Sequence, residues 1–562
     1  MRTLLKNGTV VNVFADELFK ADVLMQDGVI IGVDDYDDAE ADAVEDVAGR
    51  FICPGFIDGH IHIESTMLTP VELARTALPH GTVAIVADPH EIANVCGAKG
   101  IEYMLAASEG LPMTVYVMLP SCVPSTVFEE SGACLTAADL APCYAHPRVL
   151  GLAEVMNYPG VVAGDGEVLA KIADARSRGK IIDGHAPLLT GRALDTYIGT
   201  GIRSDHECYS AAEGRERIRK GQWLMIRQGT AARNLPGLID LFDGPWSHRC
   251  LLVTDDVHPE DLLGHGHIDE IIRQAVRLGK SPLVGIRMAS LQAAQRFGLS
   301  DRGAIAPGYR ADVLVLDSLD DVKVRDVYAA GRKVVSGGTA VALTAPQVAA
   351  DLAKAVQDSF HLDRLTAADF MIHPAGRRCR VIKTVPDQLL TEQWIADIDW
   401  DHDGGIDLGR DILEVAVIER HKHTGHRGLG FISGIGMKAG AIASSVSHDA
   451  HNIVVIGTNQ EDMACAADHI LDIGGGFVAV RDGAVLKDVA LPIAGLMSPL
   501  PAAEVAAQNA ALRDCIYQLG VPRGIAPLMT TAFMSLSVIP ALKLTTQGLV
   551  DVDAQKIVPL CM

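Results

Sequence analysis

The sequence of 562 residues contains no uninterrupted apolar run of about 18 residues, the length that a membrane-spanning helix needs. Its most apolar stretch, near 489–503, is broken by Pro492, Pro499 and Pro501. The first residues, MRTLLKNGTVV, reach a polar pair before an apolar signal core develops. We therefore expect no membrane partner and a cytoplasmic location.

Positive charge is scarce, because 48 Lys and Arg residues stand against 71 Asp and Glu residues and leave a formal net charge of −23 at pH 7. Binding to nucleic acid requires clustered cations that neutralise phosphates, and an acidic surface repels a polyanion. We therefore expect no nucleic acid partner. Hydrophobic residues make up 49% and charged residues 21% of the chain, proportions that are typical of folded globular proteins.

The sequence also lacks CxxC pairs, and its 11 cysteines are an odd number spread over a long chain. This pattern favours reduced thiols that fill the core over a disulfide framework. Heptad arrays, short-period repeats and low-complexity tracts are missing, which excludes coiled-coil and solenoid architectures. At roughly 150 residues per domain the length allows three or four domains, of which one barrel can occupy about 250 residues.

Short apolar runs separated by helical lengths fill the region between residues 56 and 256, which is the pattern of repeated βα units. The eight runs lie at 56–63, 82–88, 114–119, 149–155, 180–186, 202–207, 223–228 and 250–256. Eight parallel strands in this length predict a closed (β/α)8 barrel of the TIM type, which we place at 51–300.

Strand and turn patterns flank the barrel on both sides. Residues 1–50 predict one part of a small β-sandwich, and residues 301–345 return to the same pattern and are expected to complete it. Residues 375–562 hold strand-like runs at 413–418 and 453–456 and Gly-rich turns, and they predict an additional C-terminal α+β domain. The predicted fold class is therefore α/β.

The motif DGHIH at 58–62 ends the first barrel run. Side chains two apart in a strand share a face, so His60 and His62 can offer two imidazoles to one centre. Further ionisable residues end other runs, and the carboxyl ends of barrel strands all meet at one mouth. They are Glu154 on the fourth run, His185 on the fifth, His206 on the sixth, and Asp255 and Asp256 on the eighth.

Neutral imidazoles and carboxylates that converge at a barrel mouth are costly to bury unless a cation binds them. Four imidazoles and two carboxylates exceed the needs of one tetrahedral ion, so the sequence predicts two divalent metal ions per chain. Glu154 is expected to bridge them. Imidazole and carboxylate suit zinc, manganese and iron alike. The predicted metal ligands are His60, His62, Glu154, His185, His206 and Asp255.

These motifs resemble the amidohydrolase superfamily and, within it, the adenine deaminase family, over nearly the whole chain. PGFIDGHIHIES at 54–65 and PGYRAD at 307–312 carry the first resemblance, and ADPHEIANV at 87–95 and SHDAHN at 447–452 carry the second. Many superfamily members bridge their metals with a carboxylated lysine, whereas GLAEV at 151–155 supplies Glu154, as is expected in this subgroup. The resemblance implies hydrolytic deamination of adenine to hypoxanthine and ammonia, in purine salvage or catabolism, and favours manganese or iron.

In that reaction a hydroxide that bridges the metals attacks C6 of the purine, and Asp255 takes up the proton and delivers it to the departing amino group. A second group must protonate or hydrogen-bond the purine ring, and Glu207, Asp256 and His90 are the candidates in that order. Adenine and water are the small-molecule partners. A homo-oligomer is expected for an enzyme of this size.

Two other functions stay open at this stage. An amidohydrolase acting on a different nucleobase or a cyclic amide would use the same metals, because both reactions add hydroxide to a trigonal carbon. A scaffold without activity predicts loss of the ligands, and all six are present.

The C-terminal region carries three further motifs. The histidines at 421, 423 and 426 favour a solvated polar loop. Adjacency of Ser447, His448 and Asp449 does not make a catalytic triad, because the fold places the members of a triad. The segment 447–452 is expected to be a loop that either covers the barrel mouth or serves packing alone.

Overall fold

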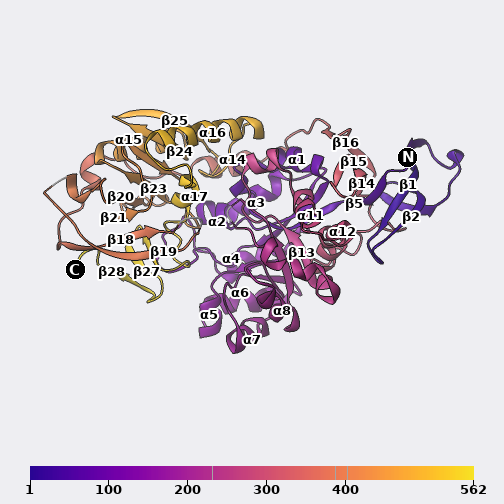
Figure 1. Ribbon diagram of the computed structural model, residues 1–562, viewed down its shortest axis with the longest axis horizontal. Coiled ribbons are helices and arrows are strands. Elements are labelled where there is room, and N and C mark those ends of the chain that lie inside the picture. Colours follow the sequence, from indigo (N-terminus) through magenta and orange to yellow (C-terminus); the bar gives the residue numbers. More distant parts are fainter. Residues whose placement is uncertain (231, 386–387, 402) are drawn as a thin grey trace.

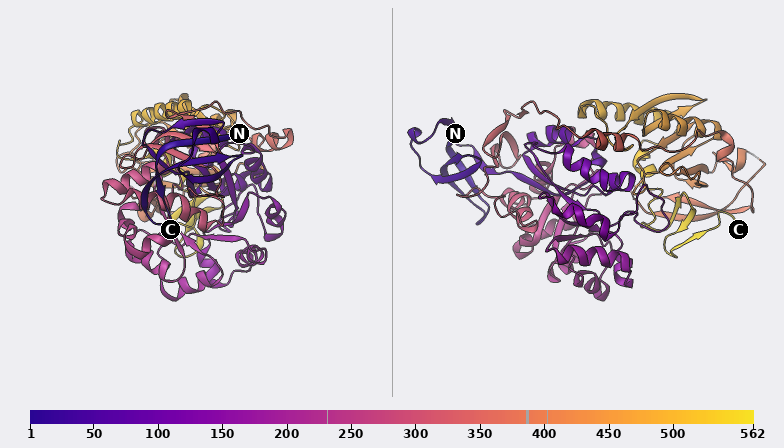
Figure 2. Two further views of the ribbon diagram at one scale, coloured as in Figure 1. Left: turned by 90° about the vertical axis from the view of Figure 1, so that its right-hand side faces the viewer. Right: turned by 180° about the vertical axis from the view of Figure 1, so that it is seen from behind.

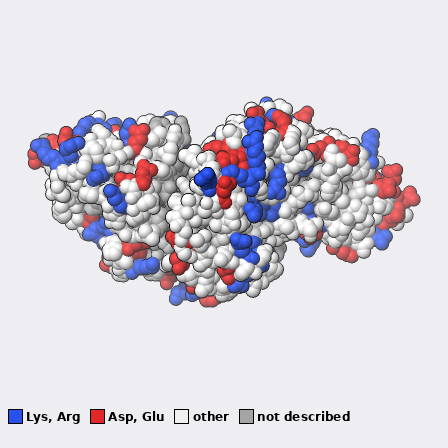
Figure 3. Space-filling model, turned by 90° about the horizontal axis from the view of Figure 1, so that it is seen from below, with Lys and Arg blue, Asp and Glu red and all other residues white. Residues whose placement is uncertain are grey.

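The computed structural model describes residues 1–230, 232–385, 388–401 and 403–562 as three parts in a row (Figure 1). A sheet with the N-terminus lies at one end, a βα barrel in the middle and the domain with the C-terminus at the other end, and the view from behind shows the same order (Figure 2). Acidic and basic side chains are mixed on the face seen from below, and acidic ones gather at the N-terminal end (Figure 3). Within the described ranges no helix has both the length and the apolar character needed to cross a membrane.

The barrel contains eight parallel strands, which lie where the sequence predicts them. They are β6 (Phe56–Ile61), β7 (Thr82–Ala87), β8 (Thr114–Leu119), β9 (Val149–Val155), β10 (Ile181–Gly184), β11 (Ser204–Asp205), β12 (Trp223–Arg227) and β13 (Cys250–Val253). Strands β6 to β10 pair in one run and β11 to β13 in another. The N–H of Arg203 donates to the carbonyl of Ile182 at 3.2 Å, and the N–H of Asp255 donates to the carbonyl of His60 at 2.9 Å. These contacts join the two runs on both sides, so the barrel closes.

Alternation along the strands divides the barrel core into an inner and an outer layer. In β7, Ala84 and Val86 point into the barrel interior, whereas Ile85 packs outward with the helices. The interior is filled so closely that a side chain at Gly59 would collide with Leu251. Glycine between the aspartate and the histidines of the DGHIH motif therefore lets β6 sit against the core.

Helices surround this barrel, and the longer ones bury one apolar stripe. In α11 the buried apolar residues Ile268, Ile271, Ile272 and Ala275 recur at helical spacing. The helices are α1 (Pro70–Ala77), α2 (His90–Cys96), α3 (Ala98–Ala107), α4 (Ala137–Leu140), α5 (Tyr158–Ala163), α6 (Gly166–Ser177), α7 (Gly191–Gly199), α8 (Ala211–Arg219), α9 (Leu235–Leu238), α10 (Pro259–Gly264), α11 (Ile268–Arg277), α12 (Pro282–Arg287) and α13 (Ala293–Arg296).

Segments from before and after the barrel share one nine-stranded sheet. The segment before the barrel supplies β1 (Arg2–Asn12), β2 (Glu17–Gln26), β3 (Val29–Asp34), β4 (Ala43–Asp46) and β5 (Phe51–Pro54). The segment after it supplies β14 (Val313–Ser318), β15 (Lys323–Ala329), β16 (Arg332–Ser336) and β17 (Thr339–Ala340). The two segments join where β14 pairs antiparallel with β5.

The C-terminal domain is built on an eight-stranded sheet, and its strands β20 and β23 match the two runs that the sequence predicts there. Its strands are β18 (Arg378–Thr384), β19 (Thr391–Asp397), β20 (Leu413–Ile418), β21 (Arg427–Ser433), β22 (Ala441–Ser444), β23 (Ile453–Gly457), β24 (Gly476–Arg481) and β25 (Ala484–Ala490). Helix α14 (Ala350–Gln357) precedes this domain and packs against α3. The remaining elements of the domain are α15 (Gln460–Asp472), α16 (Ala502–Gln518), α17 (Pro527–Ala532) and the small sheet β26 (Leu542–Thr545), β27 (Gly548–Asp551) and β28 (Lys556–Val558).

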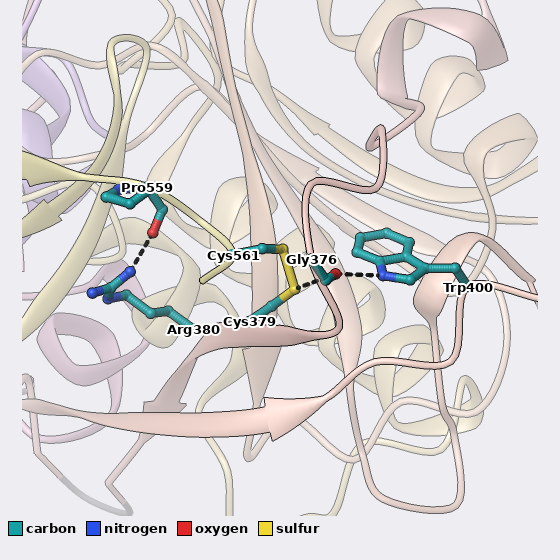
Figure 4. The surroundings of a disulfide bond; sticks show 6 residues. All are labelled: Gly376, Cys379, Arg380, Trp400, Pro559 and Cys561. Carbon is teal, nitrogen blue, oxygen red and sulfur yellow. Dashed lines mark hydrogen bonds between the residues drawn. A yellow bond between two sulfur atoms is a disulfide. The ribbon is translucent and has the colours of Figure 1, made fainter.

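A disulfide bond joins Cys379 on β18 to Cys561 near the C-terminus (Figure 4). The expectation of reduced thiols is wrong for this pair, whereas the nine other cysteines are free. The two residues are 182 positions apart, and they meet because the last residues of the chain run antiparallel to β18, with Arg380 N–H donating to the carbonyl of Leu560.

Candidate active site

His60 lies within β6 and His62 follows its end, and both side chains are buried. The carboxylate of Asp58 fixes this strand end, because it accepts hydrogen bonds from the N–H groups of His60 and Thr254, each at 3.2 Å. Nδ1 of His62 lies 3.1 Å from the carbonyl oxygen of Asp88 and must donate there. In the neutral ring this leaves Nε2 as an acceptor, as a metal ligand requires.

Glu154 lies between two pairs of histidines. Its Oε1 is 3.4 Å from Nε2 of His62 and 3.9 Å from Nε2 of His60. Its Oε2 is 2.7 Å from Nδ1 of His185 and 3.2 Å from Nε2 of His206. Burial alone would raise the pKa of this carboxyl, but the contacts with His185, His206 and His62 hold the pKa well below its usual range. The two oxygens of the Glu154 carboxylate therefore face different histidines: Oε1 faces His60 and His62, and Oε2 faces His185 and His206.

Asp255 follows β13 with a φ of 62°, a left-handed conformation that turns the chain as the strand ends. Its Oδ1 is 3.2 Å from Nε2 of His62 and 3.8 Å from Nε2 of His60. Its Oδ2 accepts a hydrogen bond from Nη1 of Arg227 at 2.5 Å. Burial opposes ionisation, yet Arg227 and His62 hold the pKa of Asp255 well below its usual range.

The donor set fits divalent cations. Nε2 of His60 is buried and has no hydrogen-bond partner in the part of the chain that the structure describes, a costly state that a cation there would relieve. His60, His62 and Asp255 offer ligand atoms within 4.8 Å of one another, and so do His60, Glu154 and His206. Imidazole nitrogens and carboxylate oxygens without thiolates suit manganese, iron and zinc.

Glu207 points into the same site, although regular strand alternation would turn it away from His206. β11 ends at Asp205, so neither residue is held by strand geometry. Oε1 of Glu207 is 3.4 Å from Nε2 of His206 and 3.6 Å from Nδ1 of His185, and it pairs with Nη1 of Arg227. Burial would raise the pKa of Glu207, but Arg227 and the two imidazoles lower it, so the group is held as a carboxylate.

The two other predicted substrate residues stand at the rim of this centre. His90 begins α2, and its Nδ1 is 3.2 Å from Oδ2 of Asp88 and 3.8 Å from Oε1 of Glu154. Asp256 accepts a hydrogen bond from Oγ of Ser65 at 2.6 Å. The structure thus brings all the residues that the sequence singles out for metal and substrate to one barrel mouth.

Sequence reasoning missed Arg227, the last residue of β12. Its guanidinium is buried between Glu207 and Asp255, and Nη2 donates to the hydroxyl of Tyr209 at 3.0 Å. The signal was present in the sequence, because Arg227 stands at the carboxyl end of the seventh run, and the predicted metal ligands stand at the carboxyl ends of other runs.

The C-terminal domain also reaches this centre. Oδ1 of Asp449 is 3.7 Å from Nε2 of His90, and Nδ1 of His448 is 3.3 Å from Oε1 of Glu91. The ring of His448 stacks on Phe533 with 4.3 Å between centroids. The segment 447–452 therefore lies at the barrel mouth. This position is the one that a segment covering the mouth requires.

The histidine cluster at 421–426 is only partly the solvated loop that the sequence favours. His423 and His426 are exposed, and their ring nitrogens lie 3.0 Å and 2.8 Å from carboxyl oxygens of Asp363 and Glu130. His421 is buried instead, with Nε2 2.7 Å from the carbonyl oxygen of Ala450. This difference arises because the chain after β20 packs against the segment 447–452.

Known proteins resemble the chain over its whole length. Residues 51–335 match the amidohydrolase family, and residues 388–556 match the adenine deaminase C-terminal domain. An adenine deaminase from Desulfatibacillum aliphaticivorans is 45% identical over 558 residues, which cover 99% of this chain and 96% of the relative. Adenine deaminase 2 from Carboxydothermus hydrogenoformans is 44% identical over 562 residues, which cover 100% of this chain and 97% of the relative. A crystal structure of D-hydantoinase gives a TM-score of 0.48 at 16% identity, covering 61% of this chain and 96% of that one. From the two relatives that match nearly the full chain and from the two family matches, the chain belongs to the adenine deaminase family of the amidohydrolases.

Proposed function

We propose that this protein converts adenine and water into hypoxanthine and ammonia with two divalent metal ions bound at the barrel mouth. The observation that carries the proposal is Glu154, whose two oxygens each face one histidine pair, as suits a carboxylate shared by two cations. The adenine deaminases to which the chain is similar over nearly its full length indicate the substrate.

The metal ligands follow from the same geometry. His60, His62 and Asp255 would hold one cation, and the second histidine pair would hold the other, with Glu154 between them. Manganese or iron is favoured by the family resemblance, and zinc is the alternative that these ligands accept. When bound, the two cations lower the pKa of a water molecule and make hydroxide available near neutral pH.

Asp255 is placed to move the proton of that water. One carboxylate oxygen faces the histidines, and the hydrogen bond from Arg227 to the other oxygen fixes the orientation of the group. It would accept a proton as the C6–O bond forms and donate that proton to the amino group as the C6–N bond breaks. One carboxylate thus acts first as base and then as acid.

Glu207 and His90 complete the contacts to the purine. Because Arg227 holds Glu207 as a carboxylate, this residue is suited to accept a hydrogen bond from an N–H of adenine rather than to protonate the ring. His90 faces the same centre from the start of α2 and is held by Asp88.

The decisive experiment measures ammonia release from a panel of purines, pyrimidines and cyclic amides, using protein whose metals have been counted. We expect adenine to be the preferred substrate and activity to rise with metal content up to two ions per chain. Release from a cyclic amide in preference to adenine would overturn the substrate assignment.

Domain limits, assembly and location are also part of the proposal. We divide the chain into 1–50 and 301–345 for the small β-domain, 51–300 for the barrel and 375–562 for the C-terminal domain. The pairing of β5 with β14 supports joining the first two segments. A homo-oligomer in the cytoplasm rests on the sequence alone, and light scattering of the purified protein together with cell fractionation tests it.

A further inference from the structure

The loop 126–130, which follows β8 of the barrel, reaches into the C-terminal domain. One carboxyl oxygen of Glu129 accepts two hydrogen bonds from Ser537, from its N–H at 3.0 Å and from its hydroxyl at 2.6 Å. Oγ1 of Thr126 is 2.5 Å from Oγ of Ser537 and must donate to it, because the one hydrogen of the Ser537 hydroxyl goes to Glu129. Glu129 and Ser537 are buried, so water does not compete for these hydrogen bonds.

The same turn of the C-terminal domain holds the start of the segment 447–452. The hydroxyl of Ser535, two positions before Ser537, donates to the carbonyl oxygen of His448 at 3.1 Å. Oγ of Ser447 lies within hydrogen-bond distance of Oγ of Ser535 and must donate to it, since the hydrogen of Ser535 is already used. The start of the segment is therefore connected to Glu129 through this turn.

The end of the segment is connected to the same loop directly. Nδ2 of Asn452 donates to the carbonyl oxygen of Glu130 at 2.7 Å. All six residues of 447–452 are described, and none of them lies in a helix or a strand, so such contacts decide where the segment sits. One loop of the barrel therefore fixes both ends of the segment that lies at the barrel mouth.

Asp449 lies between these two connections and faces the proposed purine site. Its side chain is 2% exposed, and Oδ1 is 3.7 Å from Nε2 of His90, one of the proposed purine contacts. Oδ2 is buried and has no hydrogen-bond partner in the described part of the chain, which is a costly state for a carboxyl oxygen. An N–H group of a purine bound beside His90 would supply the missing hydrogen bond.

An electrostatic effect also connects Asp449 with the loop. Burial, and after it the charge of Asp449, raise the pKa of Glu129 to about 7, although the hydrogen bonds from Ser537 oppose this shift. Such an effect requires that the two carboxyl groups lie near each other. The residue that faces His90 therefore lies close to the contact between Glu129 and Ser537.

We infer that Asp449 is a substrate-binding residue contributed by the C-terminal domain and that Glu129 is the positioning residue that holds it in place, an inference that rests on the proposed deamination. Asp449 accepts a hydrogen bond from an N–H of adenine. Glu129 does not touch the substrate and acts through Ser537 and the segment 447–452. The proposed metal ligands stand on or next to barrel strands and do not depend on this contact.

Substitutions at Asp449 and Glu129 should both weaken the binding of adenine. Asp449→Ala and Glu129→Ala should each raise KM by about 10-fold, the effect of losing one hydrogen bond to a charged group, while kcat changes much less. Glu129→Gln keeps an oxygen that can accept both hydrogen bonds and should return KM close to the wild-type value. The double alanine variant should raise KM no further than Asp449→Ala alone, whereas a role in packing would give additive effects.

A matched control breaks another hydrogen bond between the same loop and the same domain. The hydroxyl of Thr546 donates to Oε2 of Glu130 at 2.5 Å, a contact that does not lead to the segment 447–452. Thr546→Val and Ser537→Ala each remove one buried hydroxyl. Both should lower the melting temperature, but only Ser537→Ala should raise KM. Metal content is measured for every variant, and if Glu129→Ala does not fold, Ser537→Ala carries the test.

Hydrogen exchange of peptides that cover 447–452, followed by mass spectrometry, reports on the segment independently of activity. Exchange should be faster than in the wild type in Glu129→Ala and Ser537→Ala and unchanged in Thr546→Val. Wild-type exchange and wild-type KM in Glu129→Ala, with both metals bound, would overturn the positioning role, and an unchanged KM in Asp449→Ala would overturn the substrate contact. Wild-type protein that releases no ammonia from adenine would instead overturn the proposed function itself.

Discussion

Replacing Arg227 with methionine removes the cation that two active-site carboxylates share. The arginine is 5% exposed, and its Nη1 contacts both Glu207 and Asp255, whose side chains are 6–7% exposed. With an effective dielectric constant of about 20, unit charges about 4 Å apart attract by roughly 4 kcal/mol, so the two pairs give roughly 8 kcal/mol before the cost of burying the charges. Removing one partner of a buried ion pair costs about 3–5 kcal/mol in practice, and we expect the free energy of unfolding to fall by this amount.

Turnover should fall in the same variant. Asp255 would lose the hydrogen bond that orients it, and Glu207 would lose the charge that keeps its pKa low. Arg227→Lys is the matched control, because it keeps the positive charge but not the planar fork that can hold two carboxylates. It should therefore retain more of the stability than of the turnover.

Denaturant unfolding followed by circular dichroism gives the free energies of unfolding, and ammonia release gives kcat and KM on samples whose metals have been counted. An Arg227→Met protein that is as stable and as active as the wild type would refute the view that this arginine sets the charge balance of the site.

Four further predictions follow from the site and the core. Glu154→Gln should lose at least one metal ion, because an amide cannot supply the same anionic bridge, and elemental analysis that finds two tightly bound ions in a fully active variant would exclude the bridge. Asp255→Asn should bind adenine but turn over about 10²-fold more slowly or worse, and near-normal kcat with the metals intact would move the proton transfer to another carboxylate. If the segment 447–452 covers the barrel mouth and excludes water, alanine at both His448 and His451 should raise KM or lower kcat without loss of metal, and unchanged kinetics in a folded, metallated protein would leave the segment a packing role. Burial lowers the pKa of Lys543 to about 7, so the unfolded chain binds more protons between about pH 7 and about 10.5 and the free energy of unfolding should rise with pH across this window. Lys543→Met should flatten that rise in denaturation curves taken at several pH values, and identical slopes for both proteins would contradict a buried neutral amine.

The sequence by itself determined the barrel and the set of histidines and carboxylates that meet at its mouth. Strand alternation and strand length are local properties, which is why the run at 149–155 coincides with β9 and the run at 114–119 with β8. The spacing of His60 and His62 puts two imidazoles on one side of a strand, and the carboxyl ends of parallel strands meet at one mouth in every closed barrel. These regularities do not depend on which residues later come into contact.

The tertiary structure alone decided which side chains touch beyond the strand ends. Past the end of a strand, the backbone conformation of single residues sets side-chain direction, so the φ of 62° at Asp255 and the two-residue length of β11 cannot be read from alternation. The hydrogen bonds of Ser65 reach residues 26 and 191 positions away, and the disulfide from Cys379 spans 182. Such contacts arise when separate elements pack, and no local pattern in the sequence records them. The ion pairs of Arg227 and the approach of His448 to the barrel mouth therefore became visible only in the folded chain.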